Sequence, residues 1–402
     1  MKVATGHDVV VVGAGILGLA SAYHILQAGR GLDLLVLDRL PGAGRGTTAR
    51  SAAAYRDMFT SPVNRHLSQG SISFYEDLQE TGVQLDLLRI GYLWLLTEPQ
   101  VARCAPALVT MAQAGVVFET LDQQGLARRL PDLQRGDIWR GILGHRCGIL
   151  NPQRLAAFYE QAVARLGGRF HFGAEVSGFA LDHQGLIRGV KVGGKEILAG
   201  QVIVATGPWL GATMALAGLT VPVVPVKRQL FAIAAPEGPL RRLLHSAGFN
   251  GHDLLPFTIL PGGAYLRPAP AAQSFIIGFA NQDQAPGLED RPVAETEFFE
   301  TRIRPQLEQY FPGFRETGPN YAWAGNYEDH PPDNIAFVDR VAGALVVGGA
   351  SGSGIMKADS LGRAAAGLFY GQEQVELGDG RSLQVAEIGL RERTLPPEEF
   401  VI

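Results

Sequence analysis

Three glycines near the start of the chain have the spacing of a dinucleotide-binding turn. Gly13, Gly15 and Gly18 form a GxGxxG motif directly after four consecutive valines, Val9–Val12. The first glycine permits a tight turn, the second lets a pyrophosphate approach the backbone, and the third lets a helix pack closely on the sheet. Asp38 follows 20 residues after the third glycine and can accept hydrogen bonds from ribose hydroxyls. The motif therefore predicts a dinucleotide site, and the acid disfavours the 2′-phosphate of NADP.

The segments around this motif are predicted to alternate as strand, helix and strand. The valine run is typical of a buried parallel strand. Apolar residues recur at the helical period over 16–26 until Gly29, and residues 34–37 form a second apolar strand. The helix N-terminus would offer free N–H groups and a partial positive charge to phosphates. The alternative is a glycine-rich turn in an ordinary α/β protein.

The composition is that of a globular protein with one large core or two domains. The 402 residues are 46% hydrophobic and 18% charged, with a net charge of −4 that argues against nucleic-acid binding. The two cysteines, Cys104 and Cys147, form no metal-site or disulfide pattern, so we expect no metal and a cytoplasmic location. No run of about 18 apolar residues occurs, so we expect no membrane span.

A loop rich in small residues follows Asp38 and contains several hydrogen-bond donors. Thr47, Thr48, Arg50 and Ser51 lie in this loop and are candidates to bind a pyrophosphate or the edge of a cofactor ring. The alternative is a flexible surface loop. A helix is predicted from residue 62 to about residue 80.

The middle of the chain is predicted to return to the nucleotide-binding sheet. Asn151 and Pro152 are a favourable helix start, as N-cap and first helical residue. Short strands follow, and the last of them runs into the motif A-T-G-P-W, residues 205–209. This motif predicts a second close approach of the backbone to the cofactor.

A second, mostly antiparallel β domain is predicted from residue 222 onward. Residues 222–279 are rich in strand patterns, and 292–310 predicts an amphipathic helix. One face of that helix would carry Val293, Phe299 and Ile303, with Leu307 one turn further. We expect this domain to carry the substrate chamber, because pockets favour domain interfaces.

Another glycine-rich turn lies near the end of the chain. Apolar residues 345–347 are followed by G-G-A-S-G-S-G-I-M-K, residues 348–357, and then by a predicted helix to about residue 370. The N–H groups of this turn would point at an electron-rich ring edge. The alternative is a glycine-rich helix cap.

Taken in order, these motifs resemble the D-amino acid oxidase superfamily of FAD enzymes, which includes sarcosine oxidase, glycine oxidase and dimethylglycine dehydrogenase. The resemblance covers nearly the whole chain. It rests on V-V-V-V-G-A-G-I-L-G-L-A-S-A-Y-H, C-G-I-L-N-P-Q-R-L, V-I-V-A-T-G-P-W, K-R-Q at 227–229 and G-A-S-G-S-G-I-M. The stretch T-T-A-R-S-A-A-A-Y-R-D-M-F and the tail L-P-P-E-E-F-V-I are closest to the dehydrogenase-like branch, which also contains an assembly-factor flavoprotein of the respiratory chain.

The resemblance implies an α/β fold with two interleaved parts. A Rossmann-like FAD-binding domain of the GR2 type would combine with a mostly antiparallel β substrate domain. The predicted ranges are 1–85, 145–220 and 320–370 for the FAD-binding domain, 86–144 and 221–319 for the substrate domain, and 371–402 for a C-terminal tail.

The resemblance also implies a noncovalent FAD. Arg50 stands at the loop position where relatives with covalent flavin have His, and no Cys lies in the C-terminal half. Val176 would contact the adenine side through its backbone, and Ser353 replaces a His that the family often has. By position, FAD would be held by Gly13, Gly15, Ile16, Leu17, Gly18, Asp38, Arg39, Thr47, Thr48, Arg50, Ser51, Val176, Gly207, Trp209, Gly349, Gly352, Ser353, Gly354, Ile355 and Met356.

The implied activity is oxidation of a small amine or amino acid of the sarcosine, glycine, proline or N-methyl amino acid class, with hydride transfer to flavin N5. Arg56 and Lys357 are candidate cations for a substrate carboxylate, and Tyr265 and His330 are candidate pocket residues. For Arg56 the alternative is a structural ion pair. Ile276 stands where sarcosine oxidase has a lysine thought to assist oxygen, which favours a dehydrogenase over an oxidase.

Several choices stay open at this level. The electron acceptor is oxygen, a quinone or a partner protein, and both a homo-oligomer and a hetero-oligomer are compatible with the sequence. One alternative function is a 2-hydroxy-acid dehydrogenase of the same fold, with His330 as the base. The other is a flavoprotein with an assembly or scaffold role and little turnover.

Overall fold

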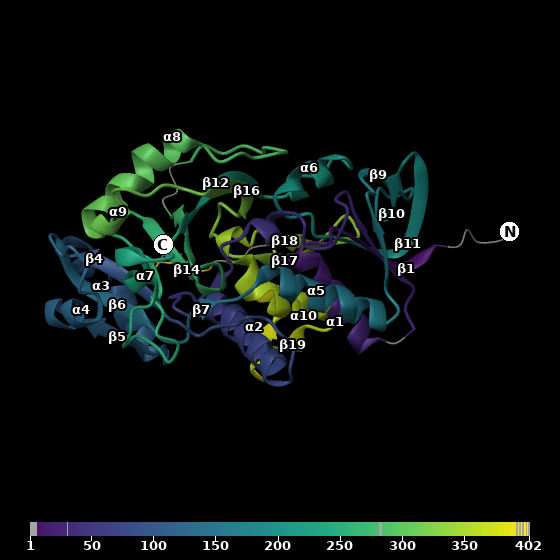
Figure 1. Ribbon diagram of the computed structural model, residues 1–402. Helices are drawn as coiled ribbons and strands as arrows, with labels where there is room; N and C mark the ends of the chain where they lie inside the picture. Colours follow the sequence, from purple (N-terminus) through teal and green to yellow (C-terminus); the bar gives the residue numbers. More distant parts are fainter. Residues whose placement is uncertain are drawn as a thin grey trace.

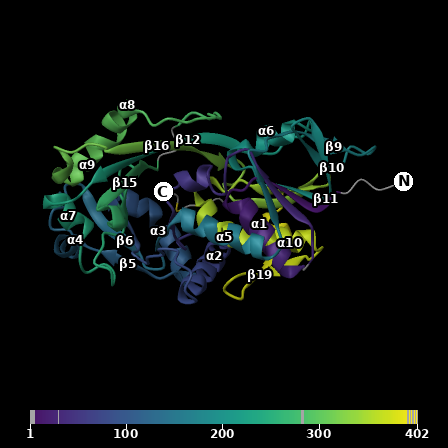
Figure 2. The ribbon, with the colours of Figure 1, turned by 45° about the vertical axis from the view of Figure 1, so that its right-hand side comes forward.

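The computed structural model describes residues 6–29, 31–280 and 284–390, together with residues 393, 395, 398 and 400. Two eight-stranded sheets organise this part of the chain. They lie at opposite ends of the molecule in Figure 1, and the turned view in Figure 2 keeps them apart. Among the described helices, none combines the length and the apolar character that crossing a membrane requires.

The first sheet has a parallel centre, as the valine run predicted. Its hydrogen-bonded order is β17-β18-β11-β1-β2-β8, and the antiparallel strands β9 and β10 extend it from β11. Val9 lies opposite Gln201 of β11 and Leu34 of β2, so the valine strand is central and buried. Its strands are β1 (His7–Val12), β2 (Leu34–Asp38), β8 (Arg169–Phe172), β9 (Val176–Leu181), β10 (Ile187–Val192), β11 (Lys195–Val204), β17 (Phe337–Val341) and β18 (Ala344–Gly348).

Helices cover one face of this sheet, and strands with a short helix cover the other. Because side chains alternate along a strand, Val9 and Val11 pack toward the helices, whereas Val10 and Val12 pack toward β9, β10 and α6. Figure 1 shows α1, α5 and α10 running together below the sheet. The helices of this half are α1 (Ile16–Ala28), α2 (Pro62–Glu80), α5 (Pro152–Arg165), α6 (Leu210–Ala215) and α10 (Gly354–Phe369).

The second sheet is mostly antiparallel, in the order β16-β12-β15-β14-β13-β4-β6-β5. One face, with Phe231 and Leu266, packs against helices, and the other, with Leu230 and Tyr265, faces the first half of the molecule. Its strands are β4 (Tyr92–Thr97), β5 (Phe118–Leu121), β6 (Ile138–Gly144), β12 (Val224–Ala234), β13 (Phe257–Ile259), β14 (Ala264–Ala269), β15 (Ser274–Phe279) and β16 (Tyr321–Asp329), and its helices are α3 (Glu98–Gln113), α4 (Gln123–Arg129), α7 (Gly238–Leu244), α8 (Thr296–Phe298) and α9 (Arg304–Tyr310).

The chain crosses between the two halves more than once. Strand β16 falls in the range 320–370 predicted for the FAD-binding domain, yet it pairs along its length with β12 of the second sheet. The domain boundaries otherwise stay a prediction.

Two small antiparallel pairs lie outside the two large sheets. They are β3 (Ala54–Tyr55) with β7 (Gly148–Ile149) and β19 (Gln374–Glu376) with β20 (Ser382–Gln384).

The predicted continuous helix over 292–310 is wrong in its first part. The segment consists of α8, a π-helical stretch Phe299–Ile303, and α9. Val293 precedes the first of these and is 69% exposed, whereas Phe299, Ile303 and Leu307 are buried as predicted. Pro305 lacks the N–H that an α-helical hydrogen bond needs, so a wider turn before it is physically reasonable.

The first and last helices of the parallel half pack tightly on each other. A Cβ at Gly362 of α10 would lie 2.7 Å from the backbone of Ala20 in α1. One turn away, His24 Nε2 lies 2.6 Å from Asp359 Oδ1, and both side chains are buried. This contact joins the two ends of the chain around the same sheet.

We predict that Gly362→Ala destabilises the protein by roughly 1–3 kcal/mol, because the added methyl group must push two packed helices apart. Gly251→Ala is the matched control, since a Cβ there meets no atom within 4 Å. Urea unfolding of both variants tests this. Equal stability of the two variants would show that the helix contact is not tight.

Candidate cofactor and substrate site

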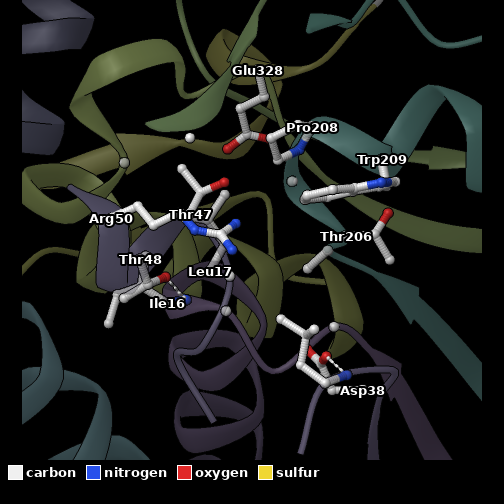
Figure 3. A pocket seen from close by; sticks show the side chains of 18 of the residues that line it. Ile16, Leu17, Asp38, Thr47, Thr48, Arg50, Thr206, Pro208, Trp209 and Glu328 are labelled. Atoms are coloured by element: carbon white, nitrogen blue, oxygen red, sulfur yellow. Dashed lines mark hydrogen bonds between the residues drawn. The ribbon is translucent and has the colours of Figure 1, made fainter. Parts of the chain in front are cut away.

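A cavity of about 500 Å³ lies between the two halves of the molecule and is lined by residues of both. Figure 3 shows it lined by side chains from both halves of the chain. Most of the predicted cofactor residues line it, from both ends of the sequence. These are Gly13, Gly15, Ile16, Leu17, Asp38, Arg39, Thr47, Thr48, Arg50, Ser51, Val176, Gly207, Trp209, Gly352, Gly354 and Ile355.

The first glycine turn leaves backbone open toward the cavity. Gly13 has φ +108°, and a Cβ at Gly18 would overlap the carbonyl oxygen of Gly13. Gly18 therefore supports the turn from behind and does not line the cavity. At Gly15 the nearest atom to an added Cβ is Thr48 Oγ1, at 3.7 Å. Gly15 therefore leaves space for a ligand phosphate to approach the start of α1.

Asp38 marks one end of the cavity, and its carboxylate is fixed by the backbone. Its oxygens accept hydrogen bonds from the N–H groups of Ala14 at 2.7 Å and Leu40 at 2.8 Å. Arg39 forms an ion pair with Asp290 at 2.7 Å and stacks over the Trp209 ring at 4.4 Å. The remaining lone pairs of a fixed carboxylate suit the hydroxyls of a ribose.

The loop after β2 supplies polar groups along the middle of the cavity. Thr48 Oγ1 accepts the N–H of Ile16 at 3.1 Å, which ties the loop to the start of α1. Thr47 donates to the carbonyl oxygen of Asn326 at 3.2 Å, and the carbonyl oxygen of Arg50 accepts from Trp323 at 3.0 Å. Figure 3 shows the Arg50 guanidinium in the cavity. A cation at this position favours an anionic ligand.

The C-terminal glycine turn contributes a second wall. Gly352, Gly354 and Ile355 line the cavity, and a Cβ at Gly352 would lie 2.6 Å from the Tyr327 ring. The other predicted residues of this turn do not line the cavity. Gly349 packs on Phe337 and His330, Ser353 donates to the carbonyl oxygen of Ala350 at 2.8 Å, and Met356 is buried in the core.

The other end of the cavity is formed by the antiparallel sheet. Arg228 and Leu230 of β12, Tyr265 of β14 and Tyr327 of β16 line it. The guanidinium carbon of Arg228 lies 5.0 Å from the centre of the Tyr327 ring. Burial raises the pKa of Tyr265 and Tyr327 above the usual value, so both phenols stay neutral. Neutral phenols beside one guanidinium form a pocket suited to a small anion.

Arg56 and Lys357 do not line this cavity, although the sequence predicted them as carboxylate clamps. Arg56 donates to the carbonyl oxygens of Met58 at 2.5 Å and Phe400 at 3.1 Å, and it stacks 4.2 Å from the Phe59 ring. Lys357 donates to Asn64 Oδ1 at 2.6 Å. Both side chains are at least 95% buried, so the geometry does not support a clamp at either residue.

His330 also lies outside the cavity lining. Its Nδ1 is 2.8 Å from Asp333 Oδ1 and 3.0 Å from Arg393 Nη2, in a buried polar cluster. These partners fix the ring away from the cavity, so the geometry does not support His330 as a base. Of the four predicted catalytic residues, Tyr265 alone lines the cavity.

Sequence reasoning missed several lining residues. Arg228 belongs to the quoted K-R-Q motif, and Thr206 and Pro208 lie inside the quoted A-T-G-P-W motif, so local signals existed for these three. Glu328 also lines the cavity, next to Tyr327, and no sequence signal singled it out. Its side chain points into the cavity in Figure 3.

The lining residues fit the successive parts of a dinucleotide cofactor. A fixed acid for a ribose comes first, then an open glycine backbone at a helix N-terminus, then an apolar and aromatic end. The open backbone at Gly15 is the observation that favours a phosphate-bearing ligand, since a side chain there would fill the space.

Comparison with known proteins gives a consistent result. Residues 8–368 match the family model described as "DAO: FAD dependent oxidoreductase". The chain is 24% identical over 407 residues to FAD-dependent oxidoreductase domain-containing protein 1 of Xenopus laevis, covering 90% of this chain and 79% of the relative. It is 25% identical over 344 residues to glycine oxidase of Pseudomonas aeruginosa, covering 83% and 86%. The crystal structure of L-proline dehydrogenase from P. horikoshii superposes with a TM-score of 0.79 at 21% identity, covering 92% and 95%, which shows a shared fold.

The buried Lys357 should leave a signature in the pH dependence of stability. Burial lowers its pKa to about 7 from the ordinary 10.5. Between these values the unfolded chain binds more protons, so this residue makes the free energy of unfolding rise with pH. In Lys357→Met we expect that slope to fall by up to about 1.4 kcal/mol per pH unit. Urea unfolding at several pH values between 7.5 and 9.5 measures it.

Lys195→Met is the control for this measurement, because Lys195 is exposed. It should retain the slope of the unmodified protein. A Lys357→Met variant with the same slope as Lys195→Met would show that Lys357 is not buried as described.

Proposed function

The chain belongs to the DAO family of FAD-dependent oxidoreductases, and we propose that it oxidises a small amine or amino acid of the sarcosine, glycine, proline or N-methyl amino acid class. The observation that carries this proposal is the position of Arg228. It lines the same cavity as the glycine turns and stands beside Tyr265 and Tyr327. The names of the relatives, glycine oxidase and L-proline dehydrogenase, support the same substrate class.

The cofactor is FAD, and the glycine turns at the two ends of the chain are the groups that we propose hold it. When bound, FAD supplies the acceptor for a hydride from the carbon that bears the substrate nitrogen. Gly15 and the start of α1 would receive the phosphates, and Asp38 the ribose. No cysteine or histidine occurs among the described residues that line the cavity, which supports noncovalent binding.

We propose Arg228 as the clamp for a substrate carboxylate, in place of Arg56. A guanidinium binds a carboxylate through two parallel hydrogen bonds, which fixes the orientation of the substrate as well as its position. Arg56 is buried outside the cavity lining, where its Nη1 donates to the carbonyl oxygens of Met58 and Phe400. Arg228 stands on a paired strand, since it lies opposite Gly325 of β16.

The aromatic residues around Arg228 would shape and dry the pocket. Tyr265 stacks on Phe257 at 4.9 Å, and Phe257 stacks on Tyr92 at 4.3 Å, so the ring that lines the cavity is held from behind. A neutral, rigid aromatic wall excludes water and strengthens the charge interaction of Arg228 with its ligand. The imine left after loss of the hydride and the N–H proton is hydrolysed in water to a carbonyl compound and an amine.

We propose a dehydrogenase in preference to an oxidase. The support for this preference is Ile276, which stands where sarcosine oxidase has a lysine thought to assist oxygen. We therefore favour a quinone or a partner protein over oxygen as the electron acceptor. The cytoplasmic location stays a prediction from the cysteine content.

Anaerobic mixing tests the substrate class directly. Bleaching of the flavin absorbance by proline, sarcosine or glycine is the expected result. Bleaching by lactate or hydroxyglutarate instead would favour the 2-hydroxy-acid alternative. An unreduced flavin with a stably copurifying partner would favour an assembly or scaffold role.

We predict that Arg228→Ala raises KM for an amino acid substrate about 10- to 100-fold with a smaller change in kcat, because a charged hydrogen bond contributes 1.5–3 kcal/mol. Arg228→Lys should recover part of the loss. Arg56→Ala is the comparison variant. It should lower the melting temperature and leave KM nearly unchanged. The clamp assignment fails if Arg56→Ala alone changes KM.

We further predict that Gly15→Val weakens FAD binding at least 100-fold, because the side chain enters the space that the phosphates need. The fold should survive, since the nearest atom to a Cβ at this glycine is 3.7 Å away. Flavin fluorescence titration of the apoprotein measures the affinity, and circular dichroism checks the fold. Normal affinity in a folded variant would place the phosphates elsewhere.

A further inference from the structure

One acid in the cavity lacks a partner for one of its oxygens. Glu328 is 8% exposed and lines the cavity, and Figure 3 shows its carboxyl group pointing inward. Within the described part of the chain, its Oε2 has no hydrogen-bond partner. Burying an unpaired polar oxygen is unfavourable, so such an atom in a ligand cavity indicates a partner that the ligand brings.

The surroundings of Glu328 tell which kind of partner this is. Oε2 lies between two glycine turns, 4.0 Å from a Cβ placed on Gly207 and 3.4 Å from one placed on Gly348. Burial and repulsion by Asp329 raise the pKa of Glu328, whereas the backbone N–H groups of Gly349 and Ala350 lower it. The Arg50 guanidinium lines the same cavity. The free oxygen therefore needs a hydrogen-bond donor and not another anion.

The position of Glu328 in the cavity indicates which part of the cofactor lies next to it. Asp38 marks the ribose end, and Gly15 marks the place for the phosphates. Tyr265 and Arg228 line the part of the cavity formed by the antiparallel sheet, which we propose above for the ring and the substrate. Glu328 lies above the loop of Thr47 in Figure 3, on the side of the cavity away from Asp38. The segment of FAD between the phosphates and the flavin ring is the polyol chain, which carries hydroxyl donors.

We propose that Glu328 binds a hydroxyl group of the polyol chain of FAD through its unpartnered Oε2. Phosphates would repel this carboxylate, and the flavin ring has a single N–H donor, at N3, whereas the polyol chain has a hydroxyl donor on three successive carbons. A hydroxyl group donates to the ionised carboxylate in a charge-assisted hydrogen bond. The proposal uses the FAD site of the preceding subsection but does not depend on the substrate.

The proposal makes FAD binding depend on pH. Burial raises the pKa of Glu328 to about 8 in the absence of ligand. A hydroxyl donor favours the ionised form, so the bound cofactor lowers that pKa. By linkage, the affinity for FAD rises as the pH increases through the unliganded value. The neutral amide of Glu328→Gln removes this dependence.

The experiment is a titration of the apoprotein with FAD, followed by flavin fluorescence, at pH 6.5 and at pH 9. For the unmodified protein we expect about tenfold tighter binding at pH 9. Glu328→Gln should bind with the same, weaker affinity at both pH values. Glu237→Gln is the control and should keep the dependence of the unmodified protein, since Glu237 is exposed and does not line the cavity.

Thermal unfolding of each apoprotein establishes that the variants are folded. Binding of FAD by Glu328→Gln with unchanged affinity and pH dependence would overturn the proposal, and so would a flat profile in the unmodified protein. Both outcomes leave the oxidation of amines untouched. Conversely, a protein that shows the expected titrations but is not reduced by any amine would overturn the proposed function alone.

Discussion

The close packing of α1 against α10 is the constraint on which the site depends. Because Gly362 has no side chain, its Cα packs directly against the backbone of Ala20. The buried pair of His24 and Asp359 forms a second contact between the two helices. Each helix begins at a glycine turn, Gly15 for α1 and Gly354 for α10, and both glycines line one cavity. Residues more than 300 positions apart can therefore act on a single ligand.

The antiparallel sheet forms the rest of the cavity, because side chains along its strands alternate between the cavity face and the opposite face. Leu230 and Tyr265 face the cavity, while their neighbours Phe231 and Leu266 face the helices on the far side. If the register of β12 shifted by one residue, Leu230 would point away from the cavity and Phe231 would point toward it. Arg228 lies opposite Gly325 in the register between β12 and β16. This register therefore determines that Arg228 faces the cavity and can bind a substrate carboxylate.

The parallel sheet and the glycine turns were predictable from the sequence because their signals are local. A buried strand, a glycine turn and a helical period lie within about 20 consecutive residues. At the substrate end Tyr265 was predicted and Arg228 lies in a quoted motif, but which side chains face the cavity there depends on pairing between distant strands. Arg56 and Lys357 have suitable chemistry, but Phe59, Asn64 and Phe400 surround them. No local sequence pattern identifies Glu328 as a site residue. Its position becomes clear only in the structure, where Gly207 and Gly348 lie on either side of its carboxyl group.

The absorbance spectrum of the purified protein, taken before and after acid precipitation, tests the central claim most directly. The claim is that two glycine turns from opposite ends of the chain hold one noncovalent FAD. It predicts a yellow protein whose flavin passes into the supernatant when the protein is precipitated. A colourless protein that does not take up added FAD would contradict the account, and so would flavin that stays with the precipitate.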